Sequence, residues 1–176
     1  MKKKAFKVLK RVTLGILTLF VLLVVLVVTT SNDEKVTTPE KHISQGEVLR
    51  TRYFDVTVNS ARTYGSVSTG NMFVDLPAEE GIRYLVLNVT FKNTDDESRT
   101  IIDGEVMIDY EGKRYRYDKS EVVLAEGWGL LLDQINPLTS KTTNLVYKIP
   151  AEIKGNIWYN PGRSGKNDLI FIGSIK

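Results

Sequence analysis

The stretch Tyr84-Leu85-Val86-Leu87-Asn88-Val89-Thr90-Phe91-Lys92-Asn93 alternates in polarity and decides the fold. Leu85 and every second residue after it, as far as Phe91, are large and apolar, and on an extended chain they share one face. Tyr84 and Val86 make the opposite face apolar as well, before that face becomes polar. The pattern predicts a strand over residues 82–93 that lies in the centre of a sheet.

Shorter alternating runs lie on both sides of this strand and are separated by turn residues. The pair Glu111-Gly112 predicts a two-residue turn that joins its neighbours into a hairpin. The expected strands are residues 52–58, 82–93, 102–110, 113–118, 142–149, 156–159 and 168–172. Short strands at this spacing, without helical periodicity, predict an all-β fold, an antiparallel β-sandwich, with a barrel as the alternative.

Acidic residues on one strand of the predicted hairpin are expected to face basic residues on the other. Counting outward from the Glu111-Gly112 turn places Asp109 opposite Arg114, a pairing that stabilises a sheet. The side chains expected on the buried face are Ile102, Val106, Ile108, Tyr115 and Tyr117. The acids are therefore interpreted as a solvated sheet face, and not as a catalytic pair or a metal site. The segment Asp95-Asp96-Glu97 is interpreted in the same way, as a solvated turn.

A long apolar segment precedes the predicted sandwich. Residues 12–30 carry no charged side chain, and six basic residues stand before them. A helix over the seventeen residues 12–28 reaches about 25 Å, the short end of a bilayer span, and the flanking residues make up the shortfall. The basic flank holds the N-terminus in the cytoplasm. We expect a cytoplasmic basic tail at 1–11, a transmembrane anchor in contact with membrane lipid at 12–30, a flexible stalk at 31–45 and an extracytoplasmic β-sandwich domain at 46–176.

A cleaved signal peptide is the alternative, because it also combines a basic start with an apolar middle. The apolar run is longer than the usual signal core, and residues 27–31 offer a poor cleavage site. The retained anchor is therefore favoured, whereas cleavage would release the domain as a secreted protein.

Composition excludes several classes of function. Six of the 24 basic residues precede the span and all 21 acids follow it, so residues 31–176 carry a net charge of −3 and no nucleic-acid partner is expected. The chain has no cysteine, which excludes disulfides, thiol nucleophiles and a lipid-bearing cysteine. His42, the one histidine, falls in the expected stalk. The sequence predicts no catalytic residue, no metal site and no cofactor, and hence no enzyme.

Three segments resemble a family of bacterial extracellular domains. They are the strand quoted above, Ile108-Asp109-Tyr110-Glu111-Gly112-Lys113-Arg114-Tyr115, and Asn136-Pro137 followed by Leu145-Val146-Tyr147-Lys148-Ile149-Pro150. In this order they are similar to a telokin-like, immunoglobulin-type family of unknown function, which is often found in lipoproteins and anchored surface proteins of Gram-positive bacteria. The resemblance implies that the predicted fold is an antiparallel immunoglobulin-like β-sandwich, and it carries no catalytic residue. The chain departs from the family by having an apolar segment where a lipid-bearing cysteine is usual.

Two loops contain the candidate binding residues. Trp128 lies between Gly127 and Gly129 and is either a recognition anchor or a core residue packed against Leu130 and Leu132, the second being favoured. Tyr64 and Asn71 bound a loop of small residues, and loops commonly carry function on such scaffolds.

These observations predict a single-pass cell-surface protein whose sandwich is a binding or interaction module. The expected partner is an envelope protein or a wall polymer. A second interpretation is an accessory subunit that modulates a membrane or envelope complex through its helix. Hydrolysis of wall glycans is disfavoured, since no pair of carboxylates on the predicted hairpin is free of basic neighbours. The sequence carries no signal of oligomeric state.

Overall fold

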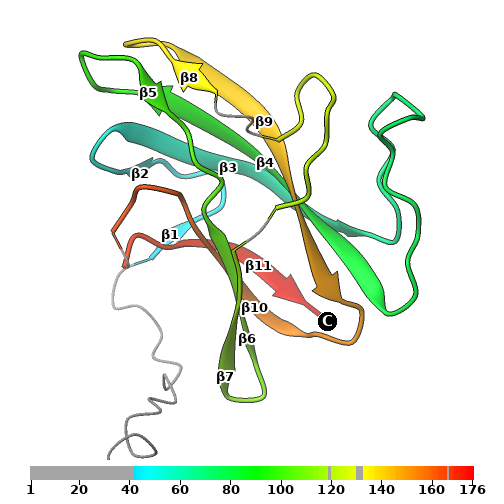
Figure 1. Cartoon of the computed structure of the whole chain (residues 1–176). Coiled ribbons are helices and arrows are strands. Elements are labelled where there is room, and N and C mark those ends of the chain that lie inside the picture. The colour runs from blue at the N-terminus through cyan, green and yellow to red at the C-terminus, as the bar shows by residue number, and fades with distance from the viewer. Residues whose placement is uncertain (1–41, 119, 130–132, 166) are drawn as a thin grey trace, which may run out of the picture. The chain divides into compact units, whose positions relative to one another are not determined.

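The computed structural model describes residues 42–118, 120–129, 133–165 and 167–176 (Figure 1). The expected cytoplasmic tail, the transmembrane anchor at 12–30 and residues 31–41 of the expected stalk lie outside the described residues. All regular elements of the described part are strands. Among the described residues, none belongs to a helix with the length and apolar character of a membrane span.

Two sheets pack face to face as a sandwich. The larger has the order β1-β11-β10-β6-β7, from Ile43–Ser44, Ile170–Ile175, Gly155–Asn160, Glu105–Tyr110 and Lys113–Tyr117. The smaller has the order β2-β3-β4-β9, from Leu49–Arg50, Phe54–Tyr64, Ile82–Asn93 and Ser140–Pro150. A two-stranded ribbon joins β5 (Arg99–Thr100) to β8 (Gln134–Ile135). The predicted all-β sandwich is confirmed, although β1 runs parallel to β11 and so departs from a wholly antiparallel arrangement.

Strand β4 lies at the centre of the smaller sheet, as predicted, with β3 and β9 on its two sides. Its inward side chains form the middle of the main core, and Leu85, Leu87, Val89 and Phe91 are almost completely buried. Burying four such residues contributes on the order of 8 kcal/mol relative to exposing them. The outward side chains Tyr84 and Val86 are buried too, because loops cover this end of the sheet.

Strand β3 continues six residues beyond the predicted end at Val58. The register of its pairing with β4 shifts between Val58 and Ser60, as in a β-bulge. A bulge inserts one residue and reverses which positions face the core, so Ala61 packs inward where strict alternation would place it outside. After Val58 the odd-numbered positions face the core in place of the even-numbered ones. The prediction that the strand ends at Val58 was therefore wrong, because the alternation continues with its two faces exchanged.

The β6–β7 hairpin has the predicted register, with Asp109 opposite Arg114 and Ile108 opposite Tyr115. Asp109 Oδ1 accepts a hydrogen bond of 2.7 Å from Arg114 Nε. Glu111 and Gly112 have φ angles of 49° and 75°, which suits a tight hairpin turn. Tyr115 was expected to be buried and is instead exposed, because β7 is the edge strand of its sheet.

Ile102 was also expected inside and is exposed. The strand begins only at Glu105, because Gly104 adopts a φ of 83° and interrupts the extended chain. A Cβ atom on Gly104 would lie 2.3 Å from the carbonyl oxygen of Asn160, so glycine permits a close approach of two backbones here.

The domain begins earlier than the predicted boundary at residue 46. Ile43 and Ser44 form β1 against β11, and the exposed His42 ring packs edge-on against Trp158 at 5.3 Å. Residues 42–45 therefore do not belong to a stalk. Their polar sequence hid this, because β1 is only two residues long and its partner strand lies near the C-terminus.

Candidate functional site

Two loops cover the outer face of the smaller sheet at one end of β4. Residues 65–81, here called the 65–81 loop, join β3 to β4, and residues 120–129, the 120–129 loop, follow β7. Both contribute to a second apolar cluster, separate from the main core. Its members are Val67, Leu76, Tyr84, Val86, Val123, Ala125, Trp128 and Val146. The apolar outer face of β4 and β9 thus requires the loops as a cover, which fixes the position of both.

An ionic group ties the two loops to each other. Lys148 Nζ, on β9, lies 2.8 Å from Glu79 Oε1 of the first loop and 3.6 Å from Glu121 Oε2 of the second. The Tyr84 hydroxyl oxygen lies 2.9 Å from Glu79 Oε1 and 2.9 Å from the carbonyl oxygen of Pro77, two acceptors for its single proton. Hydrogen bonding from Lys148, and then from Tyr84, lowers the pKa of Glu79 below its ordinary value.

The 65–81 loop is held by its own hydrogen bonds. Asp75 Oδ1 accepts from the Thr69 backbone amide at 2.6 Å and from the Thr69 hydroxyl at 2.9 Å, and Val67 pairs with Leu76 as an isolated bridge. The carbonyl of Asn71 accepts from the Val74 amide at 2.9 Å. This internal order presents residues 72 and 73 at the tip of the loop.

Acidification is expected to loosen this loop. The Thr69 amide, and then the Thr69 hydroxyl, hold the pKa of Asp75 below its ordinary value of 3.8. A carboxyl with a lowered pKa contributes stability that is complete above 3.8 and is lost as the pH falls through its folded value. We therefore expect the Thr69 amide to lose protection from hydrogen exchange below about pH 3.8, and Asp75→Asn to abolish this pH dependence.

Asn71→Asp is the control for this experiment, because it places a new carboxyl in the same loop while Asp75 keeps its partners. It should leave the exchange profile of Thr69 in place. Loss of Thr69 protection at the same pH in Asp75→Asn would show that another group controls the loop.

The 120–129 loop is joined to the edge of the smaller sheet. Gly129 donates its amide to the carbonyl of Asn144 at 2.8 Å, and Asn144 donates in return to the carbonyl of Gly127 at 2.9 Å. The Thr143 hydroxyl adds a bond of 2.8 Å to the carbonyl of Gly129. Through these bonds the loop pairs with the outer edge of β9. They hold Trp128 half-buried against the second cluster. Leu130 and Leu132, the expected packing partners of Trp128, lie outside the described residues.

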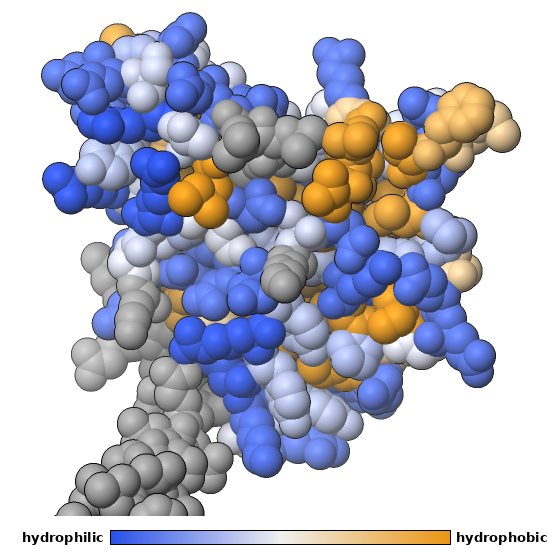
Figure 2. Space-filling model, viewed as in Figure 1, coloured by the Kyte–Doolittle hydropathy of each residue, from blue (hydrophilic) through white to orange (hydrophobic). Residues whose placement is uncertain are grey.

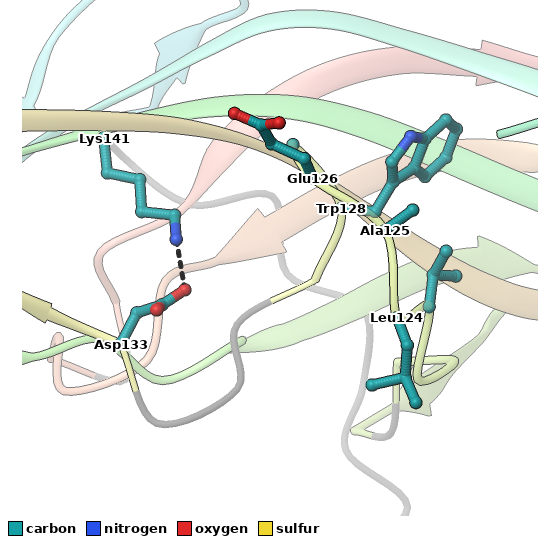
Figure 3. Close-up of a pocket in the computed structure, with 8 residues that line it drawn as sticks. Leu124, Ala125, Glu126, Trp128, Asp133 and Lys141 are labelled. Carbon is teal, nitrogen blue, oxygen red and sulfur yellow. Dashed lines mark hydrogen bonds and ion pairs between the residues drawn. The ribbon is translucent and has the colours of Figure 1, made fainter. Parts of the chain in front are cut away.

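A hollow of about 360 Å³ opens beside this loop (Figure 3). Apolar residues of the loop line it, together with Glu126 and an ion pair between Lys141 and Asp133. Trp128 and Ala125 lie together in the close-up, away from the Lys141–Asp133 ion pair. The hollow therefore combines an apolar wall with charged groups.

Four large apolar side chains project from the two loops into solvent. Met72 and Phe73 are 79% and 89% exposed, and Val122 and Leu124 are 70% and 61% exposed. Figure 2 shows apolar side chains gathered over these loops, whereas much of the rest of the visible face is hydrophilic. We call these four residues the two-loop surface. An exposed apolar group of this kind is typical of a contact site.

The structure brings the predicted candidates to one end of the smaller sheet. Tyr64 is exposed and pairs in register with Tyr84, so both side chains lie on the outer face beside the second cluster. Asn71 is exposed next to the loop tip, whereas Trp128, in the 120–129 loop, is half-buried against the second cluster. The four residues of the two-loop surface were not singled out from the sequence. The signal available was the apolar run Met72-Phe73-Val74 between Gly70-Asn71 and Asp75 in a loop of small residues.

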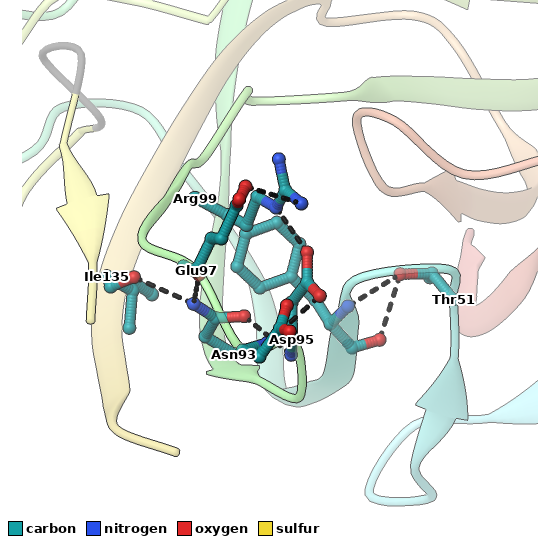
Figure 4. Close-up of polar contacts among 8 residues, drawn as sticks. Thr51, Asn93, Asp95, Glu97, Arg99 and Ile135 are labelled. Atoms are coloured by element: carbon teal, nitrogen blue, oxygen red, sulfur yellow. Dashed lines mark hydrogen bonds and ion pairs between the residues drawn. The ribbon is translucent and has the colours of Figure 1, made fainter. Parts of the chain in front are cut away.

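The side chains of Asp95 and Glu97 form structural contacts at the other end of β4 (Figure 4). Arg99 pairs with Asp95 and lies 3.1 Å from Glu97 Oε2, and its guanidinium stands 4.6 Å above the Tyr53 ring. Hydrogen bonding from Arg99 lowers the pKa of Asp95. Within the ranges that the structure describes, no three acidic or histidine side chains are grouped so that they could hold a metal ion.

Comparison with known proteins places the chain in a family. Residues 43–168 match the model described as "Domain of unknown function (DUF4352)". No curated protein matches the chain.

The fold is similar to an uncharacterized β-sandwich protein from Clostridium difficile 630, with a TM-score of 0.54 and 16% identity, over 78% of this chain and 97% of that one. A conserved hypothetical protein from Bacillus anthracis has a TM-score of 0.49 and 20% identity, over 80% and 99%. The yjhA protein from Bacillus subtilis has a TM-score of 0.48 and 18% identity, over 74% and 98%. The chain is thus a β-sandwich that belongs to the DUF4352 family, whose function is unknown.

Proposed function

We propose that this protein is a single-pass surface protein whose sandwich, of the immunoglobulin-like and telokin-like type, binds another envelope protein through the two-loop surface. The charge asymmetry around residues 12–30 supports the anchor and an extracytoplasmic position of the domain. The observation that carries the binding role is the exposure of Met72, Phe73, Val122 and Leu124 on loops that the fold holds in place.

Exposure of these side chains to water is unfavourable, and the fold of the domain leaves them uncovered. Covering four large apolar residues would gain on the order of 6 kcal/mol before the cost of association is subtracted. The supporting contacts keep the loops in position, so little ordering is needed when a partner covers them. Three of the four side chains are aliphatic or a thioether and suit an apolar pocket of a polypeptide. Sugar rings prefer a flat aromatic platform, and among the four only Phe73 is aromatic. A protein partner is therefore favoured over a wall polymer.

Replacing the tip of the 65–81 loop should remove binding and preserve the fold. In Met72→Ser/Phe73→Ser two exposed side chains are truncated outside both apolar clusters, so the unfolding midpoint should change little. A photoreactive residue at position 124 of the full-length chain in intact cells should form one major protein adduct. We expect the double substitution to reduce that adduct at least tenfold, as measured by mass spectrometry.

Leu138→Ser is the matched control. Leu138 is 76% exposed, but it contacts the Asn93 end of β4, opposite the end that the loops cover. Its substitution should leave the adduct unchanged. An adduct with glycan alone, or equal yields from the loop variant and the wild type, would contradict the proposed function.

A further inference from the structure

We infer that the partner of the two-loop surface presents a cationic, apolar polypeptide segment to it, in which lysine or arginine side chains alternate with large apolar ones. The inference rests on the proposed function and goes further by naming the chemistry of the partner. It is argued from the charges that surround the exposed apolar residues.

The two loops carry charge of one sign. Residues 65–81 and 120–129 together contain five acids and no lysine, arginine or histidine. The five are Asp75, Glu79, Glu80, Glu121 and Glu126. The sheet beneath contributes Lys148 and Arg62, the second by its register opposite Val86 on the outer face. Negative charge therefore remains in excess around the apolar residues.

The arrangement of these acids leaves some of them available to a partner. Glu79 and Glu121 share Lys148, and Asp75 is used inside its own loop. Glu80 and Glu126 are exposed, one on each loop, and Glu126 also lines the hollow beside Trp128. Exposed apolar residues and exposed acids thus lie on the same two loops, and we call Glu80 and Glu126 the acidic rim. This combination is complementary to a segment that carries both apolar and cationic side chains.

Lysine and arginine side chains fit such a surface for a second reason. Their aliphatic stems can cover exposed apolar atoms while their charged ends reach the rim carboxylates. The same rim opposes an anionic lipid surface, which attracts basic segments and repels acidic ones. The charge pattern thus favours a basic polypeptide over the membrane as the group that covers the two-loop surface.

Two short soluble peptides test this inference on the full-length chain reconstituted in neutral lipid. One alternates lysine with leucine and tryptophan, and the other has glutamate in place of each lysine. We expect the lysine peptide to shift the amide resonances of residues 70–76 and 121–128, and the glutamate peptide to bind at least tenfold more weakly. Raising the salt from about 0.01 to about 1 M, which shortens the screening length from about 30 to about 3 Å, should abolish the difference.

The second measurement is the affinity for the lysine peptide after the charge of Glu80 or Glu126 is reversed. Glu80→Lys and Glu126→Lys should each weaken binding of the lysine peptide about threefold, and together about tenfold. Asp96→Lys makes the same change of charge at the far end of β4 and should have no effect. Equal binding of both peptides, or insensitivity to the rim substitutions, would overturn the inference.

The photo-crosslinked adduct at position 124 in cells shows whether the cationic partner alone is wrong or whether the proposed function fails as well. If the adduct forms and depends on Met72 and Phe73 but not on Glu80 and Glu126, the surface binds a protein and the cationic partner is wrong. If anionic vesicles shift the same resonances as strongly as the lysine peptide does, the surface binds lipid and the inference is overturned. If Met72→Ser/Phe73→Ser leaves the adduct intact, the proposed function itself fails.

Discussion

Replacing Gly155 with alanine is expected to destabilise the domain by about 3–5 kcal/mol, since backbone strain and a steric clash act together. Gly155 begins β10, between β11 and β6, and has a φ of 119°. A Cβ atom at this position would lie 1.9 Å from the carbonyl oxygen of Asp109, which is backbone and cannot rotate away. The substitution must either separate β10 from β6 or change the backbone of the first β10 residue.

Gly173→Ala separates the two causes. Gly173 has a φ of 120°, almost the same as that of Gly155, but a Cβ atom added to it would meet no described atom within 4 Å beyond its own chain neighbours. It should therefore show the backbone strain alone, about 1–3 kcal/mol. Urea denaturation of both variants, with equal m-values, measures the difference. Equal losses of stability would show that β6 and β10 do not approach as closely as described.

Asn93→Asp is expected to have a comparably large effect, about 3–5 kcal/mol at neutral pH. The Asn93 side chain is fully buried, and its Nδ2 donates at 2.8 Å to the carbonyl oxygens of both Glu97 and Ile135 (Figure 4). Its Oδ1 accepts from the Asp95 amide at 2.9 Å. A carboxylate would keep this last bond but would place a negative charge against two carbonyl oxygens.

Asn93→Ala tests whether the lost donors or the new charge dominates. Alanine leaves both carbonyls without this donor and should cost about 2–3 kcal/mol, less than the aspartate. Asn71→Asp makes the identical exchange at an exposed position and should change the free energy of unfolding by less than about 0.5 kcal/mol. A small effect of Asn93→Asp would contradict the role of Asn93 in joining the end of β4 to the β5–β8 ribbon.

The fold was predictable where its cause was local. The register of the β6–β7 hairpin follows from the Glu111-Gly112 turn, and β4 follows from uninterrupted alternation. The second half of β3 was missed because a bulge changed the phase of the pattern after Val58. Strand β1 was missed because Ile43 has little apolar sequence around it and pairs with Ile170, far away along the chain.

The candidate site was predictable only in part. Trp128, Tyr64 and Asn71 pointed to the two loops that carry the proposed surface, but not to their being neighbours. The exposure of Met72 and Phe73 could not be foreseen, because an apolar pair in a loop fits a buried position equally well. The ionic contact of Lys148 with Glu79 and Glu121 joins three segments that are distant in sequence.

The sequence by itself determined the class of fold, the hairpin register and the expectation of a membrane anchor, because polarity alternation, turn chemistry and a run of uncharged residues are all local properties of a chain. The tertiary structure alone decided which apolar residues are covered. Burial depends on what packs above a side chain, and here the outer face of β4 and β9 is covered by two loops from distant parts of the sequence. Those loops bury Val67 and Val123 and leave Phe73 and Val122 in solvent.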